Sequence, residues 1–222
     1  MKHSCELFPP KMPRVAQQLH LEEQDTSLLG WLALLELIEL AAKDGREVMS
    51  PGQELGADLW SQILTLPPTI AKLKNVKRLN LHGSALLRIP PEIGEMEALE
   101  VFDPYTSYGL HWFPYEITRC RQLRLSYVST RALYGNYKHH PPFPFLRPVV
   151  KALVPPCCSV CNGPLDPEYV AQRWVSLQVA TDVLPLLINA CSGACLGKIP
   201  APPAGYISRP HRGGPSMQPP RK

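Results

Sequence analysis

Three copies of a short motif at nearly even spacing constrain the fold of this chain more than any other feature of its sequence. The copies are Leu66-Pro-Pro-Thr-Ile70, Ile89-Pro-Pro-Glu-Ile93 and Phe113-Pro-Tyr-Glu-Ile117, and their first residues lie 23 and 24 positions apart. A fixed period of about 20–29 residues is typical of proteins in which each unit buries its apolar face against the next. We therefore expect residues 66–140 to form a stack of about three units.

Apolar residues continue each unit beyond its proline. The positions are filled by Leu73, Val76, Leu79, Leu81 and Leu86, then by Met96, Leu99, Phe102, Pro104 and Leu110, then by Cys120, Leu123, Ser126, Val128 and Leu133. These units resemble the leucine-rich repeat family in its L-P-x-x-I-x-x-L-x-x-L-x-x-L-x-L form. The chain departs from the family at Ser84 and Ser107, where asparagine is usual, and at Pro104 and Ser126. Overall it resembles the small leucine-rich repeat proteins of bacteria, which implies a short solenoid that binds protein.

Three units bury only a thin core, so the two ends of such a stack need covering. Apolar residues at helical spacing predict a helix that begins after Asp25 or Thr26, either of which can be its N-cap, and ends at Gly45. A second helical piece is expected over residues 50–64. We expect these helices to cover one end, and the segment that follows the prolines of 141–156 to pack near the other end.

Four of the seven cysteines form two close pairs, Cys158-x2-Cys161 and Cys191-x3-Cys195. Zinc is held by four thiolates at about 2.3 Å, and two short chelating loops joined by a hairpin supply that geometry. The sequence therefore predicts a structural zinc site. Disulfide pairing is the alternative, and a cytosolic protein makes it the less favoured one.

The segment between the cysteine pairs reads as a hairpin. Residues 174–179 alternate as a strand, residues 183–188 are expected to pair with them, and Pro185 predicts that the second strand is an edge or a bulged strand. Gly163 permits the tight turn of a zinc knuckle. Cys157 is an alternative ligand to Cys158, but the Asn-Gly pair that follows Cys161 favours Cys158.

The cysteine module at 157–198 resembles treble-clef zinc modules of the TRASH and MYM type, through the Cys-Ser-x-x-Cys form of its second pair. That resemblance implies a hairpin followed by a short helix whose first turn carries the last two thiolates. The expected fold class is α/β in the α+β sense, with a capped solenoid followed by a zinc-knuckle module. The expected segments are a flexible leader at 1–24, a helical cap at 25–65, repeats at 66–140, a proline-rich connector at 141–156, the knuckle at 157–198 and a disordered tail at 199–222.

Polar and aromatic side chains are expected on one face of the repeats, because alternate residues of a strand point away from the core. Aromatic residues that lack a consensus position add to this set. The candidate partner-binding residues are Arg78, Asn80, His82, Asp103, Tyr105, Tyr108 and His111. The alternative, that this strip is only a solvated surface, stays open.

The leading hypothesis is a non-enzymatic platform for protein–protein interaction. Paired carboxylates, a nucleophile with a base and a phosphate-binding glycine loop are not recognisable in the sequence, which argues against an enzyme. The alternative is a zinc-dependent protein that associates with nucleic acid, but a net charge of +4 is small for that role. The basic residues that would serve it are Arg173, Lys198, Arg209 and Arg212.

The expected location is the cytoplasm, without a membrane partner. The most apolar run, residues 28–42, contains Glu36 and Glu39 and falls short of the roughly 18 uncharged apolar residues of a membrane span. The start of the chain lacks the pattern of a secretory signal.

Overall fold

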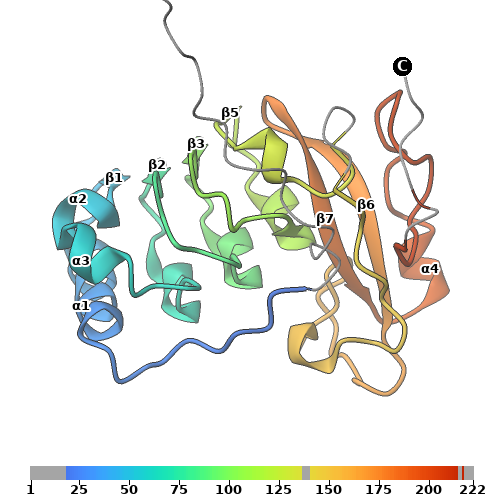
Figure 1. Ribbon diagram of the computed structural model, residues 1–222, viewed down its shortest axis with the longest axis horizontal. Coiled ribbons are helices and arrows are strands. Elements are labelled where there is room, and N and C mark those ends of the chain that lie inside the picture. Colours follow the sequence, from blue (N-terminus) through green and yellow to red (C-terminus); the bar gives the residue numbers. More distant parts are fainter. Residues whose placement is uncertain (1–18, 137–140, 215–216, 218–222) are drawn as a thin grey trace, which may run out of the picture.

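A computed structural model describes residues 19–136, 141–214 and 217 of the chain. The fold combines helices with two sheets, which confirms the expected α+β class (Figure 1). The first sheet is parallel, and its strands in spatial order are β1 (Val48–Met49), β2 (Arg78–Asn80), β3 (Val101–Asp103) and β5 (Leu125–Ser126). Its register places Val101 beside Arg78 and Leu125 beside Val101. Neighbouring strands are thus offset by the same 23 and 24 residues that separate the sequence motifs.

Each of the three motifs opens a 3-10 helix on the other side of the core from the strands (Figure 1). These helices are η1 (Pro68–Lys72), η2 (Pro91–Glu95) and η3 (Tyr115–Arg119). A proline fits the first turn of η1 and η2, since its missing N–H would have no partner there. The isoleucine of each motif is at most 1% exposed, so the core lies between the strands and the 3-10 helices. A shorter 3-10 helix, η4 (Thr130–Ala132), follows β5.

A ladder of serine hydroxyls ties the turns that follow the strands. The Ser84 hydroxyl donates to the Ser107 oxygen at 2.7 Å, and the Ser107 hydroxyl donates to the carbonyl of Leu81 at 3.0 Å. The hydroxyl oxygen of Ser129 accepts the backbone N–H of Thr106 at 2.8 Å. Ser84 and Ser107 thus supply cross-turn hydrogen bonds at the two positions where the sequence departs from asparagine.

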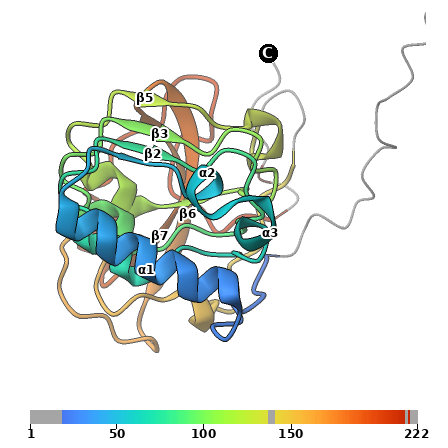
Figure 2. The same ribbon diagram turned by 90° about the vertical axis from the view of Figure 1, so that its left-hand side faces the viewer.

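Three helices cover the first end of the parallel sheet, where β1 is the edge strand (Figure 2). α1 (Leu29–Asp44) starts later than expected, because the Asp25 carboxylate caps a separate turn by accepting the N–H and hydroxyl of Ser27. Its end at Gly45, with φ 68°, agrees with the prediction.

The single helix expected over 50–64 is instead two short ones, α2 (Pro51–Leu55) and α3 (Ala57–Trp60). They are separated by Gly56, whose φ of 81° cannot continue a helix.

A hairpin covers the second end. β6 (Ala171–Val179) and β7 (Asp182–Ala190) are antiparallel, and the two-residue β4 (Phe113–Pro114) pairs in parallel with β7. β7 is therefore a middle strand, which corrects the expected edge strand. Pro185 is tolerated there because β4 pairs with β7 only at Leu186 and Leu187.

Ser126 explains how the hairpin meets the parallel sheet. Its hydroxyl donates to the carbonyl of Val179 at 3.1 Å, and the hydroxyl of Thr181 donates to the carbonyl of Ser126 at 2.8 Å. The residue that interrupts the apolar pattern is thus the one that bonds the covering element.

The proline-rich connector and the segment predicted to be a disordered tail both pack against one tryptophan. Trp174 is fully buried, and its indole N–H donates to the carbonyl of Pro144 at 2.8 Å. Its backbone exchanges two hydrogen bonds with His211, at 2.8 and 3.0 Å. The connector therefore packs as part of the fold, with a short helix η5 (Lys151–Leu153), and the expectation of a disordered tail is wrong for residues 206–214. The prediction was based on the many prolines in these segments and did not take into account the aromatic residues between them.

The leader is placed from Leu19 onward. Arg88 donates to the carbonyls of His20 and Glu22, which fixes residues 19–24 along the repeats. The rest of the predicted leader, residues 137–140 of the predicted repeats and residues 215–216 and 218–222 of the predicted tail lie outside the described residues.

Candidate metal centre

Four thiols from two distant parts of the chain meet beside β7. Cys158 and Cys161 lie on the loop before β6, Cys191 follows β7, and Cys195 lies in α4 (Gly193–Leu196). Their sulfur atoms all lie within 4.8 Å of one another, and the Cys161–Cys191 and Cys191–Cys195 distances are both 3.6 Å. A tetrahedron with metal–sulfur bonds of about 2.3 Å has sulfur–sulfur edges of about 3.8 Å. The predicted convergence of these four cysteines is confirmed, and the cluster has the size to hold one metal ion.

The first cysteine pair lies on a tight turn. The N–H of Cys158 donates to the carbonyl of Gly163 at 2.7 Å, and the N–H of Asn162 donates to the carbonyl of Cys158 at 2.9 Å. The left-handed residue is Asn162, with φ 61°, which corrects the role given to Gly163. Asparagine tolerates this conformation better than most residues.

The second pair is placed by the start of α4. The hydroxyl of Ser192 caps this helix by accepting the N–H of Cys195 at 3.2 Å. Cys158 and Cys195 are buried, whereas Cys161 and Cys191 are exposed. One side of the cluster is therefore closed by the fold, and the other side meets solvent.

The surroundings of the cluster lower the pKa of one thiol, that of Cys158, and raise the pKa of another, that of Cys191. Burial alone would raise the pKa of Cys158, but backbone N–H groups of Cys161, Cys191 and Val160 lower it to about 7. The neighbouring sulfurs, that of Cys195 first and that of Cys161 next, raise the pKa of Cys191 to about 12. Four thiolates this close need a cation among them, which is what a bound metal supplies.

Hydrogen bonds from residues that no sequence motif marks hold the loop of Cys158 and Cys161 against β7 and η3. Ser159 and Asn189 exchange two hydrogen bonds, at 2.9 and 3.0 Å. Arg119 donates to the carbonyls of Cys158 and Ser159. Beside them, burial raises the pKa of the Glu116 carboxyl, which is hydrogen-bonded to Ser159. These partners are 30 to 43 residues apart in sequence, and no local pattern marks them.

Two other cysteines lie outside the cluster. Cys157 is exposed and pairs through its backbone with Pro164, so Cys158 and not Cys157 is the member of the cluster. Cys120 is buried in the core, where burial raises the pKa of its thiol to about 12, as its apolar position in the repeat predicts. All six cysteines of the described part are free thiols, and Cys5 lies outside it.

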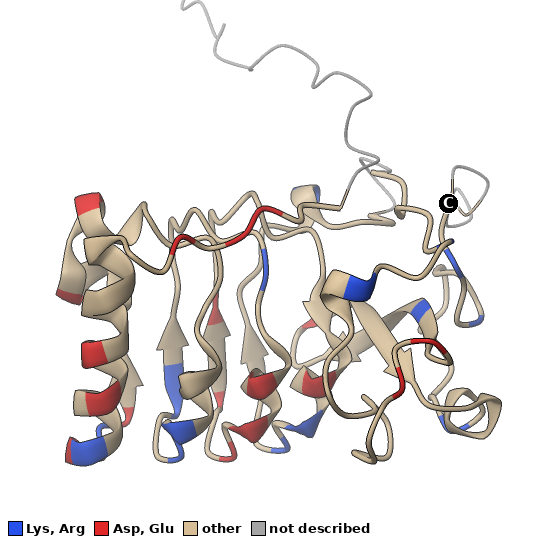
Figure 3. Cartoon of the chain, turned by 90° about the horizontal axis from the view of Figure 1, so that it is seen from below, with Lys and Arg blue, Asp and Glu red and all other residues tan. Residues whose placement is uncertain are grey.

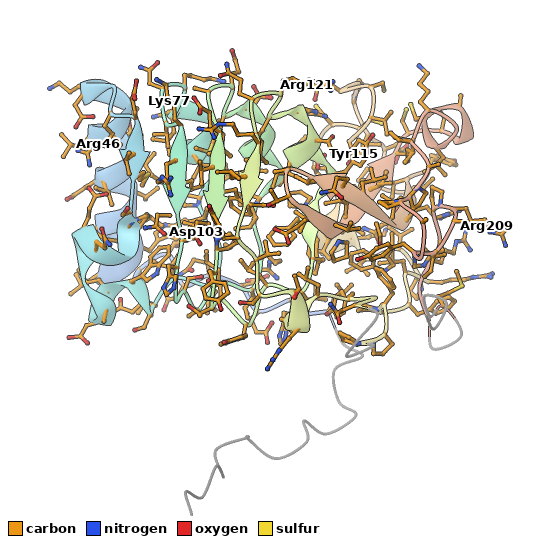
Figure 4. All side chains as sticks on the ribbon, turned by 90° about the horizontal axis from the view of Figure 1, so that it is seen from above. Arg46, Lys77, Asp103, Tyr115, Arg121 and Arg209 are labelled. Carbon is orange, nitrogen blue, oxygen red and sulfur yellow. The ribbon has the colours of Figure 1, made fainter. Side chains whose placement is uncertain are left out.

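Six of the seven candidate partner-binding residues lie on β2, on β3 or on the turns that follow them. Arg78, His82, Tyr105 and Tyr108 are exposed, and Asn80 and Asp103 are half-buried. Figure 4 shows Asp103 at the C-terminal end of the parallel strands, opposite the end marked by Lys77. Tyr105 and Tyr108 keep 51% and 63% of their surface exposed, which is much for an aromatic residue.

His111 is the seventh candidate, and the expectation that it is an exposed aromatic is wrong. Its ring is half-buried between those of His20 and Tyr134, with centroid distances of 5.4 and 5.2 Å. Its Nδ1 donates to the carbonyl of Ala132, and burial lowers its pKa. The leader segment covers it through His20, a contact that no local sequence pattern predicts.

The basic residues of the nucleic-acid hypothesis include one close pair, because burial and then the charge of Arg212 lower the pKa of Arg173. Lys198, Arg209 and Arg212 are exposed, whereas Arg173 is half-buried and donates to the carbonyl of Gln172. Along the repeats, Lys and Arg alternate with Asp and Glu (Figure 3).

No protein-family model matches the chain, and no curated protein matches it significantly. Within residues 19–136 and 141–214, helices with the length and apolar character of a membrane span are not found. The functional argument therefore starts from the geometry of the chain itself.

Proposed function

We propose that this protein is a non-enzymatic platform for protein–protein interaction, built as a short leucine-rich repeat solenoid with a structural zinc site. The observation that carries the proposal is the exposure of tyrosines at successive steps of the stack. Tyr105 and Tyr108 follow β3, and Tyr127, which is 45% exposed, follows β5. Large, exposed aromatic side chains that do not join the core are typical of surfaces that bind protein.

The solenoid interpretation is supported by the agreement of two independent periods. The sequence motifs and the strand register share the offsets of 23 and 24 residues. The packing of η2 against η3 is close enough that a side-chain carbon at Gly94 would lie 2.6 Å from the carbonyl oxygen of Glu116. A stack of this kind presents a fixed row of strand side chains, which suits recognition of one partner surface.

Zinc is the metal that the donor set fits best. Four thiolates at tetrahedral spacing suit zinc and do not suit magnesium or calcium, which prefer oxygen ligands. With all four positions filled by protein sulfur, no position is open for a substrate or an activated water. The ion would hold the knuckle to α4 and contribute folding free energy on the order of 10 kcal/mol in apparent terms.

Comparative capture tests this function. The full chain is immobilised as native protein, as the Tyr105→Ala/Tyr108→Ala double variant and as a Tyr169→Ala control, whose tyrosine is 81% exposed but precedes β6. We expect one specific protein to be retained by the native chain and the control and to be lost from the double variant. Equal retention on all three would contradict the proposal. Salt-sensitive retention of nucleic acid instead of protein would support the alternative.

A further inference from the structure

An open pocket lies where the last repeat, the hairpin and the segment after α4 meet. Its volume is about 600 Å³, and η3, β6 and residues 198–203 all contribute to its lining. Sites for small molecules and for peptide side chains typically have about 300–1,000 Å³. Residues that line it include Tyr115, Arg121, Leu123, Leu177, Lys198 and Pro200, and we call it the basic pocket.

The basic pocket lies apart from the tyrosine surface of the proposed function. Figure 4 shows Arg121 at the end of the strands that is marked by Lys77, opposite the end marked by Asp103. Tyr105 and Tyr108 follow β3 and therefore belong to the Asp103 end. A ligand of the basic pocket would thus occupy a second binding surface.

Positive charge in the basic pocket is not neutralised by the protein. Arg121 and Lys198 are both exposed, and the described lining contains neither Asp nor Glu. Within residues 19–136, 141–214 and 217, neither side chain forms an ion pair or a hydrogen bond. Lys77 and Arg124, which also precede strands of the parallel sheet, each pair with a glutamate. Two cations without a carboxylate partner are therefore available to an acidic ligand.

The charge of Arg121 reaches the interior of the basic pocket. Burial raises the pKa of Tyr115, and a hydrogen bond with Thr118 and then the charge of Arg121 oppose that rise. A charge acts in this way only on a group that lies near it. The second cation comes from another segment, because the backbone N–H of Lys198 donates to the carbonyl of Cys195 at 3.1 Å and so ties residue 198 to α4.

The rest of the lining is mostly apolar. Leu177 and Val179 of β6 are each 6% exposed, and Leu123 and Pro203 are half-buried. Apolar surface in a pocket gains free energy when a ligand removes it from water. The lining therefore favours a ligand that combines negative charge with apolar groups.

Nucleic acid fits this lining less well than an acidic polypeptide. Nucleic acid is bound through a row of phosphate contacts and through bases that stack on exposed aromatic rings. The described lining offers two cations and one aromatic residue, Tyr115, which is half-buried. Its leucine, valine and proline side chains are suited to aliphatic groups.

We propose that the basic pocket binds an acidic segment of a partner polypeptide, with carboxylates at Arg121 and Lys198 and an apolar side chain against Leu177 and Val179. Arginine can hold a carboxylate through two parallel hydrogen bonds, and lysine attracts one as a compact charge. This inference goes beyond the proposed function, because it adds a surface that does not involve the tyrosines.

Fluorescence anisotropy with the metal-loaded full chain tests the inference. The probe is a peptide with a fluorescent N-terminal label and the sequence Glu-Glu-Leu-Val-Leu-Glu-Glu. One matched peptide has glutamine in place of every glutamate, and another has serine in place of the three apolar residues. A labelled single strand of ten thymidines represents nucleic acid. We expect saturable binding of the probe below about 1 mM, and binding of both matched peptides that is weaker by about tenfold or more.

Two double variants with the same change of net charge show where the probe binds. Arg121→Glu/Lys198→Glu should weaken binding by about tenfold or more, because each attraction becomes a repulsion. Arg131→Glu/Arg209→Glu alters two exposed residues outside the lining, and its affinity should stay within about twofold of native because salt screens distant charges. Circular dichroism and zinc content report whether each variant is folded.

Three results would overturn the inference: no saturable binding of the probe, equal binding of either matched peptide, or equal binding by a folded Arg121→Glu/Lys198→Glu protein. If that variant does not fold, the matched peptides decide with the native chain. Binding of the thymidine strand alone, with the same residue dependence, would assign the pocket to nucleic acid.

This test and the capture test fail independently. Capture that depends on Tyr105 and Tyr108, together with a probe that does not bind, would remove this inference and leave the proposed function standing. Probe binding that depends on Arg121 and Lys198, together with capture that ignores the tyrosines, would do the reverse.

Discussion

Replacing Ser107 with alanine tests the physical basis of the stack. Ser107 is only 1% exposed. Its hydroxyl oxygen accepts hydrogen bonds from the N–H of Ser84, at 3.1 Å, and from the Ser84 hydroxyl. Its own hydroxyl donates to the carbonyl of Leu81. Ser107→Ala leaves a buried N–H unpaired, at a cost of about 1–3 kcal/mol, and removes a bond to a carbonyl worth about 1 kcal/mol. The Ser84 hydroxyl can rotate, so we expect a total loss of about 2–4 kcal/mol.

Urea unfolding of the metal-loaded protein measures this loss. With a slope of about 2 kcal/mol per molar urea, the midpoint should fall by about 1–2 M. Ser61→Ala is the matched control, because its exposed hydroxyl bonds only the carbonyl of Asp58 and its loss should cost less than about 0.5 kcal/mol. If Ser107→Ala is no more harmful than Ser61→Ala, the serine ladder does not hold the turns together, and the reasoning about the stack is refuted.

Three further outcomes are expected. Chelation, or the Cys158→Ser substitution, should release one zinc ion per chain and unfold the cysteine loop and the hairpin first. A metal-sensitive dye would record the release and circular dichroism the unfolding. A chain that is purified without zinc and has the same fold would contradict this. The buried His211 has its pKa lowered to about 4, and its Nδ1 accepts the N–H of Gly213. In the unfolded chain the imidazole takes up a proton near pH 6.5, whereas the buried imidazole stays neutral until about pH 4. His211 therefore contributes about 3 kcal/mol to the free energy of unfolding above pH 6.5, and this contribution is lost as the pH falls toward 4. Native protein should lose more stability over this range than His211→Leu, and parallel pH profiles would disprove it. Ser126→Leu restores the apolar consensus, yet thermal melting should show a lower Tm, because leucine cannot bond Val179; an unchanged Tm would count against the role given to Ser126.

Patterns that depend on local spacing predicted the fold best. The motif period foretold the offsets of the parallel strands, because each repeat must bury its own leucines against the next. Gly45 marked the end of α1, since only a residue that accepts positive φ closes a helix in this way. The spacing of the two cysteine pairs predicted that the four thiols meet, because two closely spaced pairs on separate loops are typical of a metal site.

Features that depend on contacts between distant segments were missed. Whether His111 is exposed depends on His20, which lies about 90 residues earlier, and the prolines of the tail hid its pairing with Trp174. Asn162 is different, since asparagine and glycine both tolerate positive φ and their adjacent positions left the choice ambiguous.

The most direct test of the central claim is the amount of one specific protein bound by the native chain relative to the Tyr105→Ala/Tyr108→Ala variant at equal loading. Two exposed aromatic anchors, each worth more than about 1 kcal/mol, predict a fall in affinity of about thirtyfold or more. A folded, zinc-loaded double variant that binds the same protein equally well would show that the tyrosine face is not the binding surface.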